Sequence, residues 1–478
     1  MIKIINSLEK EKNACLFFIL EKKSDLKKIN NFNISEKIIN NLEKKFEEKK
    51  DKKNKDKSFC QEFFIWEKNL EKLFVCFFDE KNSKKTKEEF FWDSFRKTPE
   101  KIILYSTKNH LELAEIALLA KYKFDYYLEE KQNLELKIFK EFSTKEDKKI
   151  FEKEKKQKEE LIKNIFASRD LVALSTPEKT PEKIIKLIKS YKLKNTKIKI
   201  LDYKKIKKLG LNLLENVWKA SENKPALVIF ERIVDKKAPY YGFVWKWIVF
   251  DSGWLNVKVW KYMKWMKMDM AWASTVIHTL KELDDKKDLK VNIIWAIALA
   301  ENSISENAFR PDDIIKAYNW KTVEIINTDA EWRLVLADAM SYISDKYNLD
   351  TIITTATLTW ACMIALGYNY AWVMGNNKKI IEKLEKNNTY EKYNKLPFDN
   401  YLIEKTKWKI SDLKNLSEEV LAWASMGAAF LSNFCDKNEK FVHIDIAWVS
   451  DRKDDFWVFP AWTTGFWVKS ISEMFLSL

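Results

Sequence analysis

Glycine is scarce in this chain, and its scarcity limits the turns that the backbone can make. The 478 residues include 7 glycines but 20 tryptophans, whereas glycine normally makes up about 7% of residues. Glycine enters left-handed backbone conformations at the lowest cost, so a chain with so few glycines lacks residues for tight turns and close backbone approaches. Together the 7 glycines and 20 tryptophans make 27 residues, which is close to an ordinary glycine content.

Many of the tryptophans stand where glycine is expected. Eighteen of the 20 follow residue 217, and several lie in turn-like stretches such as W-K-W at 245–247, D-S-G-W at 251–254 and A-W-T-T-G-F-W at 461–467. We infer that UGA codons, read as glycine in the native organism, were translated here as tryptophan. The alternative is a chain that is truly rich in tryptophan, in which many large rings would have to fit tight loops.

Apolar runs alternate with amphipathic segments from about residue 183 to the end of the chain. Short apolar runs predict strands at 197–201, 226–230, 243–250, 291–299, 351–358 and 442–447. Segments with helical periodicity lie at 184–191, 209–218, 271–283, 334–347, 420–434 and 471–478. This alternation predicts an α/β domain with a central mixed sheet flanked by helices.

The first part of the chain predicts a smaller α/β domain without a recognisable active site. Strands are expected at 16–20, 74–78 and 101–105, and an amphipathic helix at 111–122. The charged segment 146–167 predicts a connecting helix. We therefore divide the chain into an N-terminal α/β domain (1–145), this helix (146–167) and a larger catalytic domain (168–478), as the length of 478 residues also favours.

Composition and charge argue against several classes of function. The net charge is +15, but only 6 of the 86 basic residues are arginine, the residue on which readers of nucleic acid rely. Nucleic acid is therefore disfavoured as a partner. Five scattered cysteines without a CxxC pair, and an N-terminus without an apolar signal segment, predict reduced thiols and a cytoplasmic location. The uncharged run 351–370 predicts a buried strand and a small-residue helix rather than a membrane span.

Charged residues gather at the ends of predicted strands. The motif N-T-D-A-E-W-R-L at 327–334 follows the apolar run 323–326 and places Asp329, Glu331 and Arg333 at alternate positions. In an extended backbone these positions share one side. In open α/β sheets, ligands bind beyond the carboxyl ends of the strands.

Two earlier segments add further acids and lysines. The predicted strand in V-W-K-W-I-V-F-D-S-G-W (244–254) carries Lys246 and ends at Asp251, and Lys258 follows shortly after. Asp269 lies in M-K-M-D-M-A-W-A (266–273), where a helix of small residues begins. Each of these residues also has an ordinary structural alternative: a turn or helix cap for an aspartate, and an exposed position for Lys246.

Four carboxylates in one partly buried site repel one another, and divalent cations would relieve that repulsion. Bridging carboxylates hold two metal ions about 3.5–4 Å apart in hydrolases, and oxygen ligands favour Mn²⁺, Mg²⁺ or Zn²⁺. The three histidines, His110, His278 and His443, are far apart in the sequence and are expected in the core or on the surface.

These motifs resemble those of the leucyl aminopeptidase (cytosol aminopeptidase) family of di-metal exopeptidases. The family patterns N-T-D-A-E-G-R-L, V-G-K-G-x-x-F-D-[ST]-G-G and M-x-x-D-M-x-G-A match 327–334, 244–254 and 266–273. Further matches are L-A-E-N (299–302), A-F-R-P-D-D (308–313) and A-T-L-T-W-A (356–361), so the resemblance extends from about residue 165 to the end. Tryptophan stands at the motif glycine positions Trp245, Trp247, Trp254, Trp272, Trp332 and Trp360.

The resemblance implies an aminopeptidase of leucine-type preference in which a hydroxide bridging two metal ions attacks the peptide. It implies that Lys258 polarises the scissile carbonyl and stabilises the oxyanion, and that Arg333 holds a bicarbonate that shuttles the proton. The expected ions are Mn²⁺ or Zn²⁺, with Mg²⁺ and Co²⁺ as alternatives. By resemblance, Asp251 and Glu331 bridge the two ions. The implied metal ligands are Lys246, Asp251, Asp269, Asp329 and Glu331, and the implied substrate contacts are Met266, Thr357 and Leu358.

The resemblance also implies the partners of the chain: peptides with a free N-terminus, whose α-amine would bind one metal, and other copies of the chain in a hexamer. Two alternatives are a non-catalytic or DNA-binding oligomer that retains the aminopeptidase fold, and a different di-metal amide hydrolase. The complete ligand set favours the enzyme, because no binding role needs all five ligands. Tryptophan at the motif glycine positions would fill the space near the metals and damage the enzyme, whereas glycine there leaves the family pattern complete.

Overall fold

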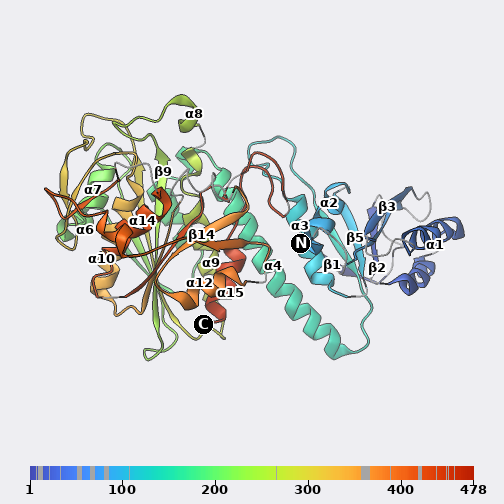
Figure 1. The fold of residues 1–478 in the computed structure, drawn as a ribbon. Coiled ribbons are helices and arrows are strands. Elements are labelled where there is room, and N and C mark those ends of the chain that lie inside the picture. The colour runs from blue at the N-terminus through green and yellow to red at the C-terminus, as the bar shows by residue number, and fades with distance from the viewer. Residues whose placement is uncertain are drawn as a thin grey trace. The chain divides into compact units, whose positions relative to one another are not determined.

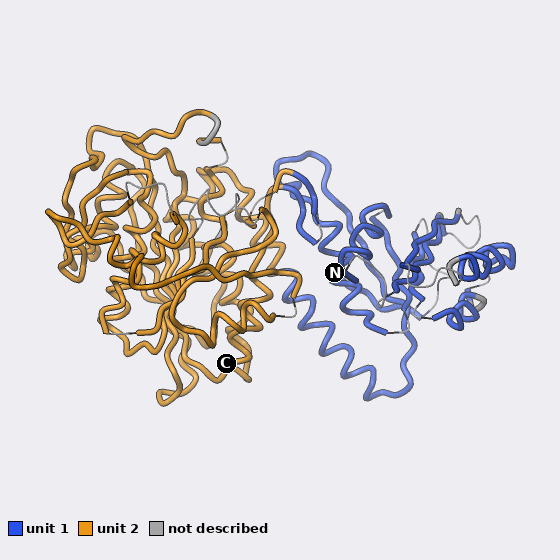
Figure 2. The backbone as a smooth tube through the Cα atoms, viewed as in Figure 1, with its two compact units in different colours: residues 1–163, 454–461 blue, residues 164–453, 462–478 orange. Residues whose placement is uncertain are grey.

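A computed structural model describes the chain in two compact units. The described residues are 1–478 except 7, 9–13, 21, 33, 51–55, 65–69, 80–85, 99, 107, 265, 357–366, 388, 418–421, 438, 448, 451 and 457. The first unit comprises Met1–Lys163 and Asp454–Ala461, and the second Asn164–Lys453 and Trp462–Leu478 (Figure 2). The division falls within helix α4 (Lys145–Ala173), which extends past the predicted end at 167. The limits 1–145, 146–167 and 168–478 remain predictions for the domains.

The first unit is an α/β domain whose sheet has the order β1-β6-β5-β2-β4-β3 (Figure 1). All neighbouring strands pair in parallel except β3, which pairs antiparallel with β4 at the edge. Every residue of β2 is buried, as expected for an inner strand with both faces covered. The elements are β1 (Ile2–Ile5), β2 (Ala14–Leu20), η1 (Lys23–Phe32), α1 (Glu36–Lys50), β3 (Phe59–Phe64), β4 (Leu70–Phe77), α2 (Lys87–Arg96), β5 (Lys101–Ser106), α3 (His110–Lys121) and β6 (Glu135–Phe139).

Two cysteines of the first unit are paired. Cys60 of β3 lies directly opposite Cys76 of β4, and the two form a disulfide. The prediction of reduced thiols is therefore wrong for this pair, because the antiparallel register that joins them leaves no sign in the sequence spacing. Cys15 and Cys435 are not disulfide-bonded.

The second unit is built on a larger mixed sheet with the order β15-β14-β17-β13-β9-β10-β8-β7. Strands β10, β9, β13 and β17 run parallel in the middle, whereas β8 and β14 pair antiparallel with their inner neighbours. This confirms the predicted mixed sheet. Its strands are β7 (Lys197–Leu201), β8 (Ala226–Arg232), β9 (Tyr240–Asp251), β10 (Asn292–Asn302), β13 (Thr351–Ala356), β14 (Tyr370–Gly375), β15 (Lys392–Lys395) and β17 (Lys440–Asp445).

Helices cover both faces of this sheet (Figure 1). Alternate residues of β9 point to opposite faces, so Val244 and Ile248 join the core beneath α7 and α10, while Phe243 contacts Phe475 of α15 on the other face. The helices are η2 (Thr176–Glu178), α5 (Pro181–Ser190), α6 (Tyr203–Leu209), α7 (Asn212–Trp218), α8 (Trp260–Met263), η3 (Met266–Met268), α9 (Ala271–Asp284), α10 (Trp332–Lys346), α12 (Lys378–Glu385), α13 (Asn400–Glu404), α14 (Trp423–Ser432) and α15 (Val468–Leu476).

Two expectations for this unit need correction. The helix predicted at 209–218 is α7, which begins only at Asn212, because Gly210 takes a left-handed φ of 75° and ends the preceding helix α6. The strand predicted at 323–326 is β12 (Thr322–Glu324), which pairs with β11 (Ile314–Lys316) and β16 (Leu413–Lys414) in a separate small sheet. The motif at 327–334 therefore does not follow a strand of the central sheet.

Tryptophan adopts backbone conformations that bulky residues avoid. Half of the described non-glycine residues with positive φ are tryptophans: Trp254 (56°), Trp320 (71°), Trp462 (78°) and Trp467 (98°). A bulky residue in this region is an outlier, whereas glycine enters it freely. The backbone geometry supports the interpretation that these positions belong to glycine.

Candidate active site

The predicted ligand residues come from the central strand β9 and from two loops. Lys246 lies within β9 and is only 3% exposed, and Asp251 ends the strand. Asp329 and Glu331 lie just before α10. The backbone is not extended there, because α10 begins at Trp332. The expectation that Asp329, Glu331 and Arg333 share one side of an extended segment is therefore wrong, and Arg333 belongs to the first turn of the helix.

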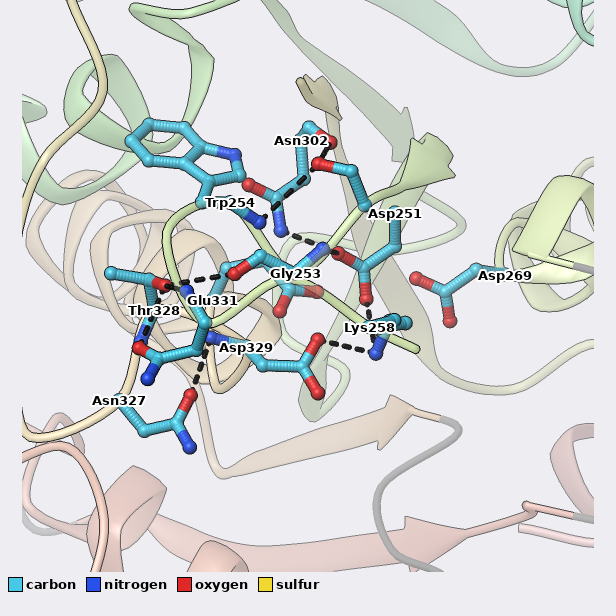
Figure 3. A network of polar contacts seen from close by, with 12 residues as sticks. Asp251, Gly253, Trp254, Lys258, Asp269, Asn302, Asn327, Thr328, Asp329 and Glu331 are labelled. Carbon is cyan, nitrogen blue, oxygen red and sulfur yellow. Dashed lines mark hydrogen bonds and ion pairs between the residues drawn. The ribbon is translucent and has the colours of Figure 1, made fainter. Parts of the chain in front are cut away.

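Three of the carboxylates converge although they are distant in the sequence. One oxygen each of Asp251, Asp329 and Glu331 lies within 4.8 Å of the others (Figure 3). Glu331 is fully buried, and its Oε2 has no hydrogen-bond partner among the described residues. Buried carboxylates are normally paired or bound to metal, so this donor set fits a divalent cation.

Two lysines pair with these acids, and one of them, Lys246, links the remaining acid to the cluster. Lys246 Nζ lies 2.7 Å from Asp269 Oδ2 and 3.5 Å from Glu331 Oε1. Lys258 Nζ lies 3.0 Å from Asp251 Oδ2 and also pairs with Asp329 Oδ1 (Figure 3). The structure thus brings all five predicted ligands and Lys258 into one network.

The network has more acids than cations, and the pKa values reflect this. Burial, and then the neighbouring Asp251, raise the pKa of Glu331 well above its usual value and that of Asp329 to about 6. Burial alone would lower the pKa of Lys246, but the surrounding carboxylates raise it instead. Lys246 can thus become a neutral ligand only where divalent cations compete with its proton.

Hydrogen bonds between Asn256 and Thr328 join the loop after β9 to the loop before α10, and the sequence did not predict either residue. Asn256 donates its backbone N–H to Thr328 Oγ1 at 3.0 Å, and its Oδ1 accepts the Thr328 N–H at 2.8 Å. The Thr328 hydroxyl also lies 2.8 Å from the Gly253 carbonyl (Figure 3). Thr328 stands beside Asp329 in the sequence, whereas Asn256 lies between two apolar residues and gives no such signal. These hydrogen bonds between the two loops fix the positions of Lys258 and Asp329 relative to each other.

Gly253 shows how little room these loops leave. Its φ is 80°, and a Cβ there would lie 2.5 Å from the Asn256 carbonyl oxygen and 3.0 Å from Asp329 Oδ1. The next residue, Trp254, also has positive φ, and its buried ring lies 4.0 Å from that of Phe309. Position 253 therefore requires glycine, and the positive φ of the next residue favours glycine there too.

Arg333 lies beside the cluster within α10 and is 3% exposed. Burial lowers its pKa to about 9, against the opposing charges of Glu331 and Asp445. Asp445, at the end of β17, was not predicted, although its place after a buried strand is a signal. The Arg333 guanidinium lies 4.4 Å from the ring of Trp332.

The predicted substrate contacts are less well placed. Met266 begins η3 and is partly buried, and its carbonyl accepts the Asp269 N–H at 3.2 Å, which links it to the network. Thr357 and Leu358 lie outside the described residues.

Known proteins resemble this chain in sequence and in fold. The model of the cytosol aminopeptidase family, catalytic domain, matches residues 166–472. The chain belongs to the cytosol aminopeptidase family. It is 36% identical over 377 residues to a "Probable cytosol aminopeptidase" of Persephonella marina, covering 76% of this chain and 74% of the relative. A "Probable cytosol aminopeptidase" of Phytoplasma mali is 32% identical over 393 residues, with 79% and 78% covered.

A solved structure extends the likeness of fold to nearly the whole chain. The bottromycin maturation enzyme BotP in complex with Mn has a TM-score of 0.79 at 20% identity, and 97% of this chain and 99% of that chain are covered. Family membership confirms the predicted resemblance and makes the chain a peptidase of leucyl type that acts on peptides. No helix in the described part of the chain has the length and apolar character needed to cross a membrane.

Proposed function

We propose that this aminopeptidase releases N-terminal residues, with a leucine-type preference, at a centre for two divalent cations. Mn²⁺ or Zn²⁺ are the proposed ions, with Mg²⁺ and Co²⁺ as alternatives. The observation that carries the proposal is the convergence of three mutually repelling carboxylates, with oxygens within 4.8 Å. When bound, the ions would lower the pKa of a water molecule and polarise the scissile carbonyl. The proposed ligands are Lys246, Asp251, Asp269, Asp329 and Glu331, with Asp251 and Glu331 shared between the ions.

Lys258 is suited to stabilise the oxyanion. The carboxylates of Asp251 and Asp329 outweigh the effect of burial and raise its pKa, so it stays protonated at neutral pH. Its side chain is 13% exposed and that of Asp329 33%, so this side of the cluster is open to a substrate. A fixed ammonium there would donate to the carbonyl oxygen as negative charge develops on it.

Arg333 is suited to hold a small anion. Its pKa of about 9 keeps it charged at neutral pH, and its Nε lacks a partner within the described part of the chain. A bicarbonate held there would accept and return the proton of the reaction. The free α-amine of a peptide would bind one of the two ions, which limits cleavage to the N-terminal residue. Met266, Thr357 and Leu358 would contact the substrate.

The proposal includes a homohexamer that works in the cytoplasm. Family resemblance supports both features. Light scattering on the full chain, of 57.0 kDa, tests the assembly, and a monomer in solution would contradict it.

The decisive experiment uses the full chain with glycine at Trp245, Trp247, Trp254, Trp272, Trp332 and Trp360, which we name the glycine form. It is incubated with Mn²⁺ and leucine anilide, with and without a chelator. The variant Asp329→Ala is compared with the control Asp412→Ala. Asp412 is an acid of the same unit, but its carboxylate lies outside the metal network. It accepts hydrogen bonds from Thr322 of the small sheet.

We expect metal-dependent release of leucine, abolished by the chelator and lowered at least ~1,000-fold in Asp329→Ala, because loss of one ligand breaks the cation centre. Asp412→Ala should release leucine at the same rate as the glycine form. The proposed function fails if release does not depend on the metal, or if both variants behave alike.

A further inference from the structure

Strand β10 ends on a fully buried asparagine that faces the candidate metal centre. Asn302 Nδ2 donates to Asp251 Oδ1 (Figure 3). The same oxygen accepts the Gly253 N–H at 3.0 Å. With Oδ1 held by two donors, Oδ2 is the atom of Asp251 that faces Lys258, at 3.0 Å.

A β-bulge makes this contact possible. Strands β9 and β10 pair residue by residue as far as Ala300 opposite Ile248, and then Asn302 lies opposite Asp251. Two residues of β9 thus oppose Glu301 alone, which shifts the register by one. Without that shift Asn302 would lie opposite Phe250. Bulges beside active sites commonly redirect a side chain in this way.

The neighbouring backbone locks the two strand ends together. The Asn302 carbonyl accepts both the N–H of Ser252, at 3.0 Å, and its hydroxyl, at 2.8 Å. Glu301 turns elsewhere and binds Ser221 and Asn223. The two polar residues of the L-A-E-N motif therefore have different roles, and only Asn302 acts on the carboxylate.

Asn292, at the other end of β10, shows what a purely structural asparagine does in the same strand. It is equally buried, and both ends of its amide are satisfied: Nδ2 donates to the carbonyls of Asp235 and Ala238, and Oδ1 accepts the N–H of Val234 at 2.8 Å. Asn302 Oδ1, in contrast, has no partner among the described residues. A buried amide left half satisfied is costly, which indicates that its position is set by Asp251.

We propose that Asn302 is a positioning residue that fixes the carboxylate of Asp251 for metal binding. This inference rests on the proposed function, because it gives Asp251 a metal to bind. Partners that orient a ligand typically change metal affinity about 10–100-fold when they are removed.

The test compares Asn302→Leu with Asn292→Leu in the full-length glycine form. Both replace a buried asparagine of β10 by an apolar side chain of similar size that makes no hydrogen bonds. Mn²⁺ binding is measured directly by calorimetry, and folding by circular dichroism and thermal unfolding. We expect Asn302→Leu to weaken Mn²⁺ binding about 10–100-fold. Asn292→Leu should lower the unfolding temperature and leave Mn²⁺ affinity within about twofold. If Asn302→Leu does not fold, the Mn²⁺ affinity of Asn302→Ala is measured in its place.

Three results overturn the inference. Folded Asn302 variants that bind Mn²⁺ as the glycine form does would show that the contact is incidental. An equal loss of affinity in Asn292→Leu would show a general effect of the strand. A glycine form that binds no Mn²⁺ would remove the proposed function and this inference with it, so the two failures can be told apart.

Discussion

Trp92 in the first unit and Trp254 in the second are both buried, but their surroundings make different demands on the backbone. Trp92 lies in helix α2, 5% exposed, with the Arg96 guanidinium 5.1 Å from its ring. Trp254 is fully buried with a φ of 56°, directly after Gly253 at 80°. One position suits a large ring on a regular helix, and the other suits a residue without a side chain.

The indole nitrogen does not separate the two positions, because neither Nε1 has a partner among the described residues. The backbone does separate them. The second unit brings charged side chains together through tight loops, and such loops need residues that tolerate left-handed conformations. The backbone geometry supports the interpretation that position 254 belongs to glycine, whereas Trp92 suits its place in a regular helix.

The largest expected effect is on activity. The glycine form should hydrolyse leucine anilide with Mn²⁺ at least ~100-fold faster than the chain that carries the tryptophans, because displaced active-site groups cost about that much. Initial rates at equal protein concentration measure it. Equal rates would show that the tryptophans belong in the enzyme.

Replacing a tryptophan by glycine should change the free energy of unfolding in opposite directions in the two units. Trp92→Gly should destabilise the first unit by about 4 kcal/mol or more, through the cavity left by the ring and the cost of glycine within a helix. Trp320→Gly isolates the backbone effect in the second unit, since its side chain is 75% exposed at a φ of 71°. Relief of that conformation should stabilise by about 1 kcal/mol. Denaturant unfolding measures both, and losses in both variants would count against the comparison.

The sequence predicted the features that composition and periodicity determine. Buried strands such as β2 and β9 are continuous apolar runs, so they were predicted to within a few residues. Strands β1 and β3 were not, because β1 is short and β3 is an edge strand whose apolar residues are interrupted by Gln61 and Glu62. The ligand residues could be named because the motifs at 244–254, 266–273 and 327–334 resemble the family patterns, although the expected backbone at 327–334 was wrong.

Other features depend on contacts between distant segments. The disulfide of Cys60 and Cys76 depends on register, and so does the bulge that brings Asn302 to Asp251. A shift of one residue changes which side chains meet, and no local pattern records it.

A smaller effect concerns pH and the second unit. Glu391 is fully buried and accepts the N–H groups of Trp467 and Ser470 at the start of α15. Burial raises its pKa to about 7. Because the folded pKa exceeds the unfolded value of about 4.5, the folded state retains the proton, and stability falls between about pH 4.5 and 7 by up to ~3 kcal/mol.

Glu391→Gln should flatten this slope, whatever its constant effect on stability. Hydrogen exchange at pH 5 and pH 8, read on peptides from α15 and from β2, separates the second unit from the first. Asp338, with a pKa raised by burial to about 7, keeps its own share of the slope. An unchanged slope at α15 would mean that Glu391 is ionised in the folded chain.

The smallest expected effect is confined to the first unit. Reducing the disulfide of Cys60 and Cys76, which are 16 residues apart, releases a loop whose closure is worth about 3 kcal/mol in the chain-entropy picture. The loss should be nearer ~2 kcal/mol, because strands β3 and β4 also tend to bring these residues together in the unfolded chain. Hydrogen exchange at β4 with and without reductant, and with Cys60→Ser as the matched variant, measures it. Exchange at β9 should stay the same, and a change there would mean that the two units unfold together.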